Sequence, residues 1–230
     1  MTRMENTSES SGFINNWKDA LKIPLFRRHV FFTFAATLFL AFFIHRFFEY
    51  IQARSGYILN DPVLNLFTPV DTSAFIFTIM YIAILASLAN IMRNPFLFIK
   101  GLQAFCMLSF MRICMLYFVP LEPDVSIIPL RDPVVDYLFY NQVLITKDLF
   151  FSGHVSTMFL LFLFVRGKQL KAFVFIVTLI VAGLILLQHS HYTIDVVAAP
   201  LFAYLSFRLA DYVAPAEQLR EMQVTTITQE

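Results

Sequence analysis

Residues 72–92 read TSAFIFTIMYIAILASLANIM, a run of 21 residues without a charged side chain. About 20 apolar residues are enough for a helix to cross the hydrocarbon core of a bilayer, so this run predicts a transmembrane helix. Five more apolar runs accompany it, at 30–48, 95–119, 149–165, 170–188 and 192–213. The sequence therefore predicts an all-α polytopic membrane protein, a six-transmembrane-helix bundle with an N-terminal interfacial helix.

The composition supports the same class of protein. Hydrophobic residues make up 58% of the 230 residues and charged residues only 14%, whereas a soluble domain averages about half apolar and about a quarter charged. The formal net charge is only +1, which argues against a nucleic-acid partner. We expect the bilayer to surround the protein, and the sequence leaves open whether chains associate as homo-oligomers.

Three parts are expected along the chain: a polar tail with an amphipathic interfacial helix at 1–28, a six-span domain at 29–213 and a cytoplasmic tail at 214–230. The interfacial helix is expected over residues 12–28. There, Phe13, Trp17 and Leu21 share one helix face and the basic residues suit lipid headgroups. The alternative for this segment is a simple polar tail.

Basic residues in the short connections predict how the chain crosses the bilayer. They gather in the N-terminal segment, after the second span and after the fourth span: Arg3, Lys18, Lys22, Arg27 and Arg28; Arg93 and Lys100; Arg166, Lys168 and Lys171. Short connections rich in Lys and Arg stay in the cytoplasm. Both termini are therefore expected in the cytoplasm, and the loops after the first, third and fifth spans on the exoplasmic side, periplasmic or lumenal.

Ser152, Gly153 and His154 stand where the fourth span begins, at its exoplasmic end. The N-terminus of a helix has free backbone N–H groups and a positive dipole end, which together bind anions. Ser152 and Gly153 would let a phosphate approach the backbone closely, with His154 beside it. The alternative is a packing contact between small residues, with the histidine satisfied by a neighbour.

Residues 189–195 read HSHYTID and open the sixth span. His191 and Asp195 are four residues apart and share a helix face. The carboxylate can accept the Nδ1 proton of His191, which leaves Nε2 free to act as a nucleophile or base. The alternative is that Asp195 pairs with a structural arginine.

Arg112 lies within the third span, about 12 Å from its exoplasmic end. A guanidinium at this depth needs an anionic partner, and a phosphate and Asp195 both qualify. Spans three, four and six thus bring a cation, two imidazoles and a carboxylate to a similar depth. These are the groups that phosphoryl transfer requires.

A metal site is the rival chemistry, because His154, His189, His191 and Asp195 could supply its ligands. However, residues two apart at the start of a helix point in different directions, and no cysteine joins the set. We therefore expect no metal and no cofactor.

At these residues the chain resembles the sphingomyelin synthase-like branch of the type-2 phosphatidic acid phosphatase superfamily. The third motif of that family, Ser-Gly-His after an acidic residue, resembles residues 148–154, and its fourth motif, His-x-His-Tyr-Thr-hydrophobic-Asp-Val, matches residues 189–196. The second motif, an arginine before an apolar and proline-containing exit, resembles residues 112–120 more loosely, and residues 60–62 (Asn-Asp-Pro) resemble the first motif weakly. The resemblance covers residues 59–205.

The resemblance implies a metal-independent enzyme whose site opens to the exoplasmic side. His191, oriented by Asp195, is then the nucleophile or base that forms a phospho-histidine-like intermediate, and His154 exchanges a proton with the lipid hydroxyl. The expected phosphate-binding residues are Arg112, Ser152 and Gly153, and the expected supporting residues are Asp148, His189 and Tyr192.

Departures from the related lipid phosphatases narrow the expected substrate. Phe105 and Ile113 occupy the Lys and Pro positions of their Lys-x6-Arg-Pro element, and Ile185 stands where they carry an arginine before the last histidine. A phosphodiester carries one negative charge per phosphate and needs fewer cations around it than a phosphomonoester. We therefore expect a phosphotransferase that moves the phospho-headgroup of a glycerophospholipid to ceramide or diacylglycerol. A lipid phosphatase that uses water as the acceptor is the alternative, and a transporter or scaffold is the alternative of another class.

Overall fold

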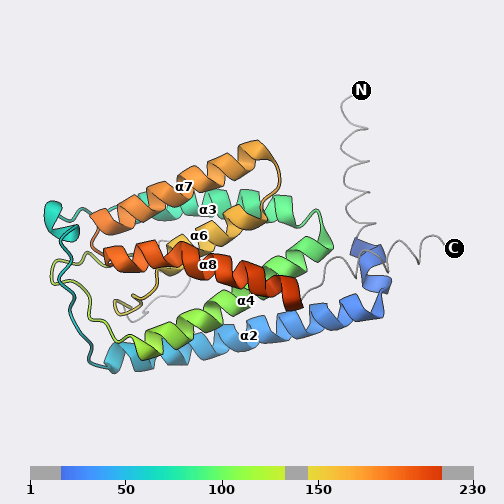
Figure 1. Cartoon of the computed structure of the whole chain (residues 1–230), viewed down its shortest axis with the longest axis horizontal. Coiled ribbons are helices and arrows are strands. Elements are labelled where there is room, and N and C mark those ends of the chain that lie inside the picture. Colours follow the sequence, from blue (N-terminus) through green and yellow to red (C-terminus); the bar gives the residue numbers. More distant parts are fainter. Residues whose placement is uncertain (1–16, 133–144, 214–230) are drawn as a thin grey trace.

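The computed structural model describes residues 17–132 and 145–213, and all its long elements are helices (Figure 1). They are α2 (Pro24–Ala53), α3 (Ser73–Ile91), α4 (Pro95–Phe118), α6 (Gly153–Phe164), α7 (Lys168–Leu187) and α8 (Thr193–Val213), with a short 3₁₀ turn, η1 (Leu64–Leu66), before α3. Within these residues five helices are long and apolar enough to span a bilayer, and α6 is a shorter apolar helix. The predicted all-α polytopic membrane fold is confirmed.

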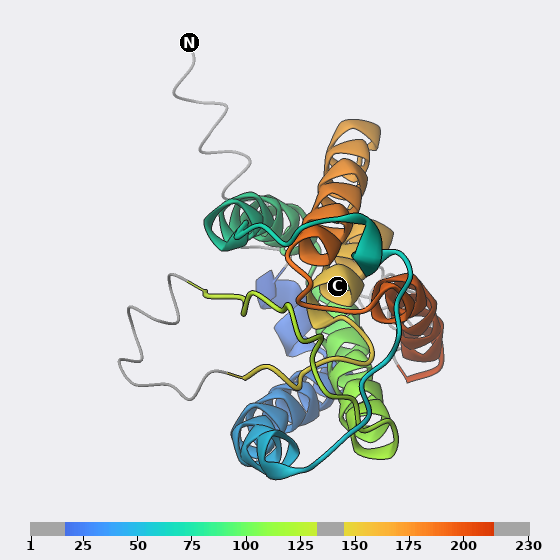
Figure 2. The same cartoon turned by 90° about the vertical axis from the view of Figure 1, so that its left-hand side faces the viewer.

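Helix α6 occupies the centre of the bundle. It packs against α3, α4, α7 and α8, whereas α2 lies on the outside against α4. Figure 2, viewed along the bundle, shows α2 and α3 on one side of α6 and α8 on the other. The start of α6 is therefore surrounded by helices that come from distant parts of the chain.

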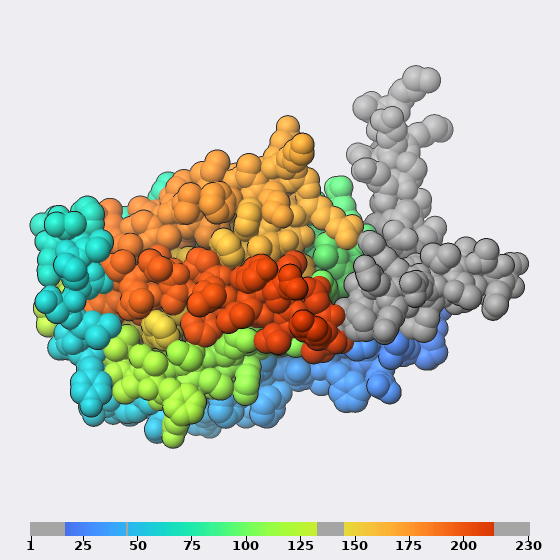
Figure 3. All heavy atoms as spheres, viewed as in Figure 1, coloured from blue at the N-terminus to red at the C-terminus, as the bar shows by residue number. Residues whose placement is uncertain are grey.

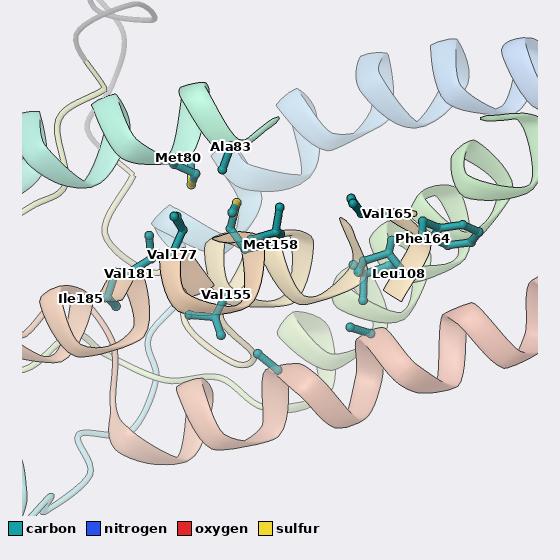
Figure 4. Close-up of a cluster of buried hydrophobic side chains, with 14 of the residues drawn as sticks. Met80, Ala83, Leu108, Val155, Met158, Phe164, Val165, Val177, Val181 and Ile185 are labelled. Carbon is teal, nitrogen blue, oxygen red and sulfur yellow. The ribbon is translucent and has the colours of Figure 1, made fainter. Parts of the chain in front are cut away.

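Close packing of small and apolar side chains holds this centre together. The buried face of α8 includes a line of small residues without exposed surface: Ala199, Ala203, Ser206 and Ala210. Small residues let membrane helices approach closely, which strengthens the van der Waals packing between them. Figure 4 shows larger side chains of the same core, with Met158 of α6 facing Met80 and Ala83 of α3.

Four predicted spans match a helix to within two residues at each end. The spans predicted at 72–92, 95–119, 170–188 and 192–213 are α3, α4, α7 and α8. Local sequence sets some of these termini. Asn94 accepts a hydrogen bond from the backbone N–H of Leu97 (3.0 Å) in front of Pro95, a favoured first helical residue.

The first span and the interfacial helix join at a different point from the predicted one. Residues 17–22 are helical, the chain bends at Ile23, and α2 begins at Pro24 and exceeds the predicted span 30–48 at both ends. Proline is favoured at the first helical position because it has no N–H to leave unpaired. The single helix expected over residues 12–28 is therefore wrong at its C-terminal part, and its first residues lie outside the described ranges.

The short N-terminal helix packs onto the bundle. Trp17 donates a hydrogen bond from Nε1 to the carbonyl oxygen of Met92 (2.8 Å), and its ring makes edge contacts with Phe26 and Phe98. Ala20 and Phe26 have no exposed surface. This segment is thus anchored where α3 connects to α4.

The fourth span is shorter than predicted. A helix over 149–165 is expected from the sequence, but α6 covers only Gly153–Phe164. That is about 18 Å of helix against about 30 Å of hydrocarbon. Residues 148–152 are not helical, and this conformation brings Asp148 and Ser152 to partners on α4 and α8. Non-helical backbone is tolerated at membrane depth where protein surrounds it, and the central position of α6 meets that condition.

The loops divide between the two ends of the bundle. Residues 54–72 lie at one end (cyan at the left of Figures 1 and 3), together with residues 119–132 and 188–192. The α3–α4 and α6–α7 connections lie at the other end, near the N-terminal helix. The basic connections therefore share one end, as the charge pattern predicts, while the side of the membrane that each end faces stays a prediction.

Candidate active site

Three helices bring the predicted site residues together near the end that the long loops cover. Arg112 lies on α4 and His154 in the first turn of α6. His191 lies just before α8, which carries Asp195 in its first turn. Because α4, α6 and α8 pack against one another, residues that are far apart in the sequence become neighbours.

His191 and Asp195 form a buried pair. The Nδ1 atom of His191 lies 3.4 Å from Oδ2 of Asp195, and that oxygen also accepts a hydrogen bond from the backbone N–H of Tyr192 (3.0 Å). His191 is 3% exposed and Asp195 is not exposed. The contact directs Nδ1 at the carboxylate and leaves Nε2 as the nitrogen available to a substrate.

His154 faces His191 across a narrow gap. The two ring centroids are 6.5 Å apart with an interplanar angle of 69°. The His154 ring also makes an edge-to-face contact with Phe77, with centroids 5.6 Å apart. The Nδ1 atom of His154 is buried and has no hydrogen-bond partner within the described ranges. The two imidazoles are therefore close neighbours, and both lie next to the start of α6.

Arg112 lies directly over the start of α6. A Cβ atom added to Gly153 would be 1.1 Å from Nη1 of Arg112, so only glycine leaves room for this guanidinium. Nη2 of Arg112 is 2.5 Å from Oδ1 of Asp148, as an ion pair. Asp148 is thus the partner of Arg112, and the alternative pairing with Asp195 considered from the sequence is wrong.

The first turn of α6 adds donors beside this cation. The helix begins at Gly153, and N–H groups of a first turn have no helical carbonyl to bind. Ser152 donates its backbone N–H to the carbonyl oxygen of Asp195 (3.1 Å), whereas its buried hydroxyl has no partner within the described ranges. Nε of Arg112 likewise forms no hydrogen bond there, whereas Nη2 is held in the ion pair with Asp148. Together these groups form the candidate anion site, next to both imidazoles.

Residues 147–212 match the family model of the PAP2 superfamily C-terminal domain. The matched segment, called the PAP2 segment below, contains His154, His191 and Asp195 but not Arg112. The match supports the type-2 phosphatidic acid phosphatase superfamily and, at the coarse level, an enzyme of the lipid phosphatase or phosphotransferase class. Neither the curated proteins nor the solved structures gave a significant match.

His189 of the PAP2 segment turns away from the two other histidines. Its Nδ1 is 2.6 Å from the hydroxyl of Ser126 and 3.7 Å from Oδ1 of Asp124, in the loop after α4. The residue has a positive φ of 55°, which redirects the chain between α7 and α8. Across residues 17–132 and 145–213, no three His, Cys, Asp or Glu side chains are grouped to hold a metal ion.

Tyr192 and Asp61 tie the loops to the start of α8. Tyr192 is almost fully buried; its hydroxyl donates to the carbonyl oxygen of Glu122 (2.9 Å) and accepts from the N–H of Leu59 (3.3 Å). Asp61 accepts from the backbone N–H (2.6 Å) and the hydroxyl of Thr193. The Asn-Asp-Pro resemblance at residues 60–62 therefore falls on a carboxylate that caps the helix carrying Asp195.

Gln188 is a structural residue of this end that sequence reasoning missed. Its side chain is fully buried; Oε1 accepts from the N–H and hydroxyl of Thr72 (both 3.0 Å), and Nε2 donates to the hydroxyl of Ser73 (2.8 Å). The only signal in the sequence was a glutamine at the end of an apolar run. Phe77, which contacts His154, gave no signal among 28 phenylalanines.

A cavity of about 290 Å³ opens beside the anion site, between α2, α3, α4 and α6. Its polar wall is formed by Arg112, Asp148, Gly153 and His154. Its remaining wall is largely apolar and comes from side chains of α2, α3 and α4. The anion site thus continues into a space that suits a hydrocarbon chain.

Substituting Gly153 by alanine is expected to displace the Arg112 guanidinium. Misplacing a positioning group by about 1 Å costs about 100-fold in rate, and we expect a loss of turnover of that order. Gly183→Ala is the matched control, because a Cβ at this helical glycine of α7 meets nothing within 4 Å. Rates of both purified variants with the same lipid substrate measure the effect, and comparable rates would mean that Arg112 need not lie over Gly153.

Asp61→Ala is expected to lower stability by about 1 kcal/mol, as loss of a helix cap does. Burial acts to raise the pKa of Asp61, but hydrogen bonds from Thr193, Val63 and Leu64 outweigh it and lower that pKa. The carboxylate therefore stabilises the fold above the ordinary aspartate pKa of about 4, and this contribution is lost as the pH falls through the lowered value.

Melting temperatures in detergent at pH 7 and pH 3 test this prediction. The difference in melting temperature between wild type and Asp61→Ala should be larger at pH 7 than at pH 3. Asn60→Ala is the matched control, because its side chain makes only an exposed contact with Asn65 (3.5 Å). A difference in melting temperature that is the same at both pH values would contradict a role for the charged form of Asp61.

Proposed function

We propose that this protein is a lipid phosphotransferase of the sphingomyelin synthase-like type. It moves the phospho-headgroup of a glycerophospholipid to the hydroxyl of a lipid alcohol, ceramide or diacylglycerol, on the exoplasmic side of the membrane, with both termini in the cytoplasm. The observation that carries the proposal is the pair of facing imidazoles, His154 and His191, beside the Arg112 guanidinium and the start of α6. The family match of residues 147–212 supports the same class of chemistry.

In the first stage, Nε2 of His191 attacks the phosphorus of the donor lipid. The new N–P bond replaces the P–O bond to diacylglycerol, and His154 in its protonated form gives its proton to the departing oxygen. Asp195 supports the positive charge that develops on the His191 ring. Arg112 and the first-turn N–H groups of α6 hold the phosphoryl oxygens, whose charge grows in the transition state.

In the second stage, neutral His154 accepts the proton of the acceptor hydroxyl. The acceptor oxygen attacks phosphorus, the N–P bond breaks and His191 returns to its starting state. Water in place of the lipid alcohol gives the phosphatase reaction with the same residues. The apolar cavity beside the site favours a lipid acceptor over water, because it allows a second lipid to enter where the first has left.

The proposal is tested with purified protein, mixed glycerophospholipids and a fluorescent ceramide or diacylglycerol. A new fluorescent phospholipid supports transfer, and released headgroup phosphate without that product supports the phosphatase. Absence of both overturns an enzymatic function and favours a transporter or scaffold. His191→Ala protein is the blank, and addition of a chelator checks for a metal requirement.

His154→Ala is expected to slow both stages with a lipid donor, and to stop turnover after the first bond is made when the leaving group needs no proton. The loss of an acid–base group lowers rates by about 10²–10⁴-fold, and the second stage needs His154 to activate the acceptor. With a donor that has a good leaving group, such as a fluorogenic phosphodiester, the first stage no longer needs its proton. The variant should then release one fluorophore per protein and retain labelled headgroup, seen by gel after acid-free quenching. Sustained release at the wild-type rate would contradict the assignment.

A further inference from the structure

The cavity that His154 lines combines charged, hydroxyl and apolar side chains. Its loop end holds the phosphate-binding groups, and its middle holds the hydroxyl residues Ser109 and Thr157. The apolar lining is Ile44, Phe48, Met80, Ile84, Phe105 and Leu108. Figure 2 shows the two helices that carry the first four of these, α2 and α3, on the same side of α6. A ligand here meets charged groups and hydroxyl groups on one part of the wall and hydrocarbon on the rest.

Ser109 and Thr157 differ from the other hydroxyl residues of the helices. Each other helical Ser and Thr within residues 17–132 and 145–213 takes part in a hydrogen bond, as Ser87 does with the carbonyl of Ala83 (2.6 Å) and Thr178 with that of Val174 (2.7 Å). Ser109 and Thr157 form none with the described residues, and both line the cavity. Both side chains are partly exposed, and a hydroxyl group can donate and accept hydrogen bonds, so these two are available to a ligand in the cavity.

The two hydroxyl residues lie about one helical turn deeper than the phosphate-binding groups. Ser109 precedes Arg112 by three residues and Thr157 follows Gly153 by four, so each shares a face with its partner at an offset of about 4.5–6 Å. In glycerolipids and sphingolipids, an ester or amide carbonyl follows the phosphate oxygen by a few bonds, and a hydrocarbon chain follows the carbonyl. The cavity presents the corresponding groups: a cation, two hydroxyl groups one turn deeper and apolar side chains.

We propose that Ser109 and Thr157 bind the carbonyl oxygen of the ester or amide linkage of the lipid, with the chain in the apolar part of the cavity. This inference rests on the proposed function and names its substrate class, acylated lipids rather than ether or prenyl phosphates. Because diacylglycerol and ceramide both carry such a carbonyl near the reacting oxygen, one subsite serves the donor and the acceptor lipid in turn.

Binding measured on catalytically blocked His191→Ala protein tests the subsite without turnover. The probes are dioleoylphosphatidic acid and its dioleyl ether analogue, which has the same chains, the same phosphate and no carbonyl. We expect the ester to bind about tenfold tighter, the effect of two neutral hydrogen bonds. Adding Ser109→Ala and Thr157→Val should bring the ester to the affinity of the ether. Thr178→Val, which removes a hydroxyl bonded to its own helix, is the matched control and should keep the preference.

Equal binding of the two probes to His191→Ala protein would overturn the inference, as would an ester preference that survives the double substitution. If the double variant fails to fold, Ser109→Ala and Thr157→Val are compared singly, and each should lose about threefold for the ester alone. Turnover by the wild-type protein is measured in parallel. Its absence would refute the proposed function, whereas the ester preference of the blocked protein decides the carbonyl subsite independently.

Discussion

Replacing His191 by alanine is expected to lower the rate of lipid turnover by about 10⁴-fold or more, the loss seen when a nucleophile of a covalent mechanism is removed. The Nε2 atom of His191 faces away from Asp195, and His154 lies across the gap where the phosphorus would be held. His189, two residues away, is not placed to substitute for it, because it is engaged with the loop after α4. Initial rates of product formation by purified protein measure the loss.

His189→Ala is the matched control for this prediction. It removes an imidazole two residues away, whose partners are Ser126 and Asp124 rather than the site. We expect it to lower the melting temperature while it keeps turnover within about tenfold of wild type, as for a residue that contributes only packing and hydrogen bonds. If His191→Ala keeps a comparable rate, or if His189→Ala abolishes turnover in folded protein, the nucleophile is assigned to the wrong histidine.

Much of the fold could be predicted because the bilayer imposes one simple requirement on the sequence. A run without charges must form a helix long enough to bond its own backbone, and this alone locates α3, α4, α7 and α8. The pairing of His191 with Asp195 was predictable for a similar reason, since residues four apart on a helix share a face whatever else surrounds them.

What could not be predicted depends on contacts between distant segments. Hydropathy places residues 149–152 in the fourth span, but these residues are not helical in the structure. Asp148 pairs with Arg112, and Ser152 donates its backbone N–H to the carbonyl oxygen of Asp195. The partner of Arg112 was open for the same reason, since the sequence pattern offered a phosphate or Asp195 and did not indicate Asp148. Ser109 and Thr157 carried no signal at all, because a missing hydrogen bond is visible only when all neighbours are placed.

The positions at which helix α2 begins and ends show a further limit of prediction from hydropathy. Its helix continues past the apolar run 30–48 to Ala53, because polar residues continue a helix once its backbone bonds are in register. The start is set by Pro24, whose effect depends on the bend at Ile23. Sequence therefore located the hydrocarbon-spanning part of α2 but not the ends of the helix.

Asp195→Asn is expected to lower turnover by about 10³-fold or more, as when an aspartate that orients a catalytic histidine loses its charge. The carboxylate accepts the N–H of Tyr192 and faces Nδ1 of His191 with the same oxygen. If the new amide turns its NH₂ group to these two atoms, it favours the tautomer in which Nε2 carries the proton and cannot attack. If it turns its oxygen to them, the tautomer is kept, but the positive charge that develops on His191 is no longer balanced.

This prediction separates a positioning role from a purely structural one. Loss of the charge should slow formation of the phospho-histidine intermediate and lower kcat, with KM for the donor lipid little changed, because Asp195 does not line the lipid cavity. Asp211→Asn is the matched control: Asp211 pairs with Lys100 near the opposite end of α8, so its substitution should leave both constants near wild type. A folded Asp195→Asn protein that forms the intermediate at the wild-type rate would show that His191 reacts without help from this carboxylate. The aspartate would then serve only to hold the start of α8 through the N–H of Tyr192.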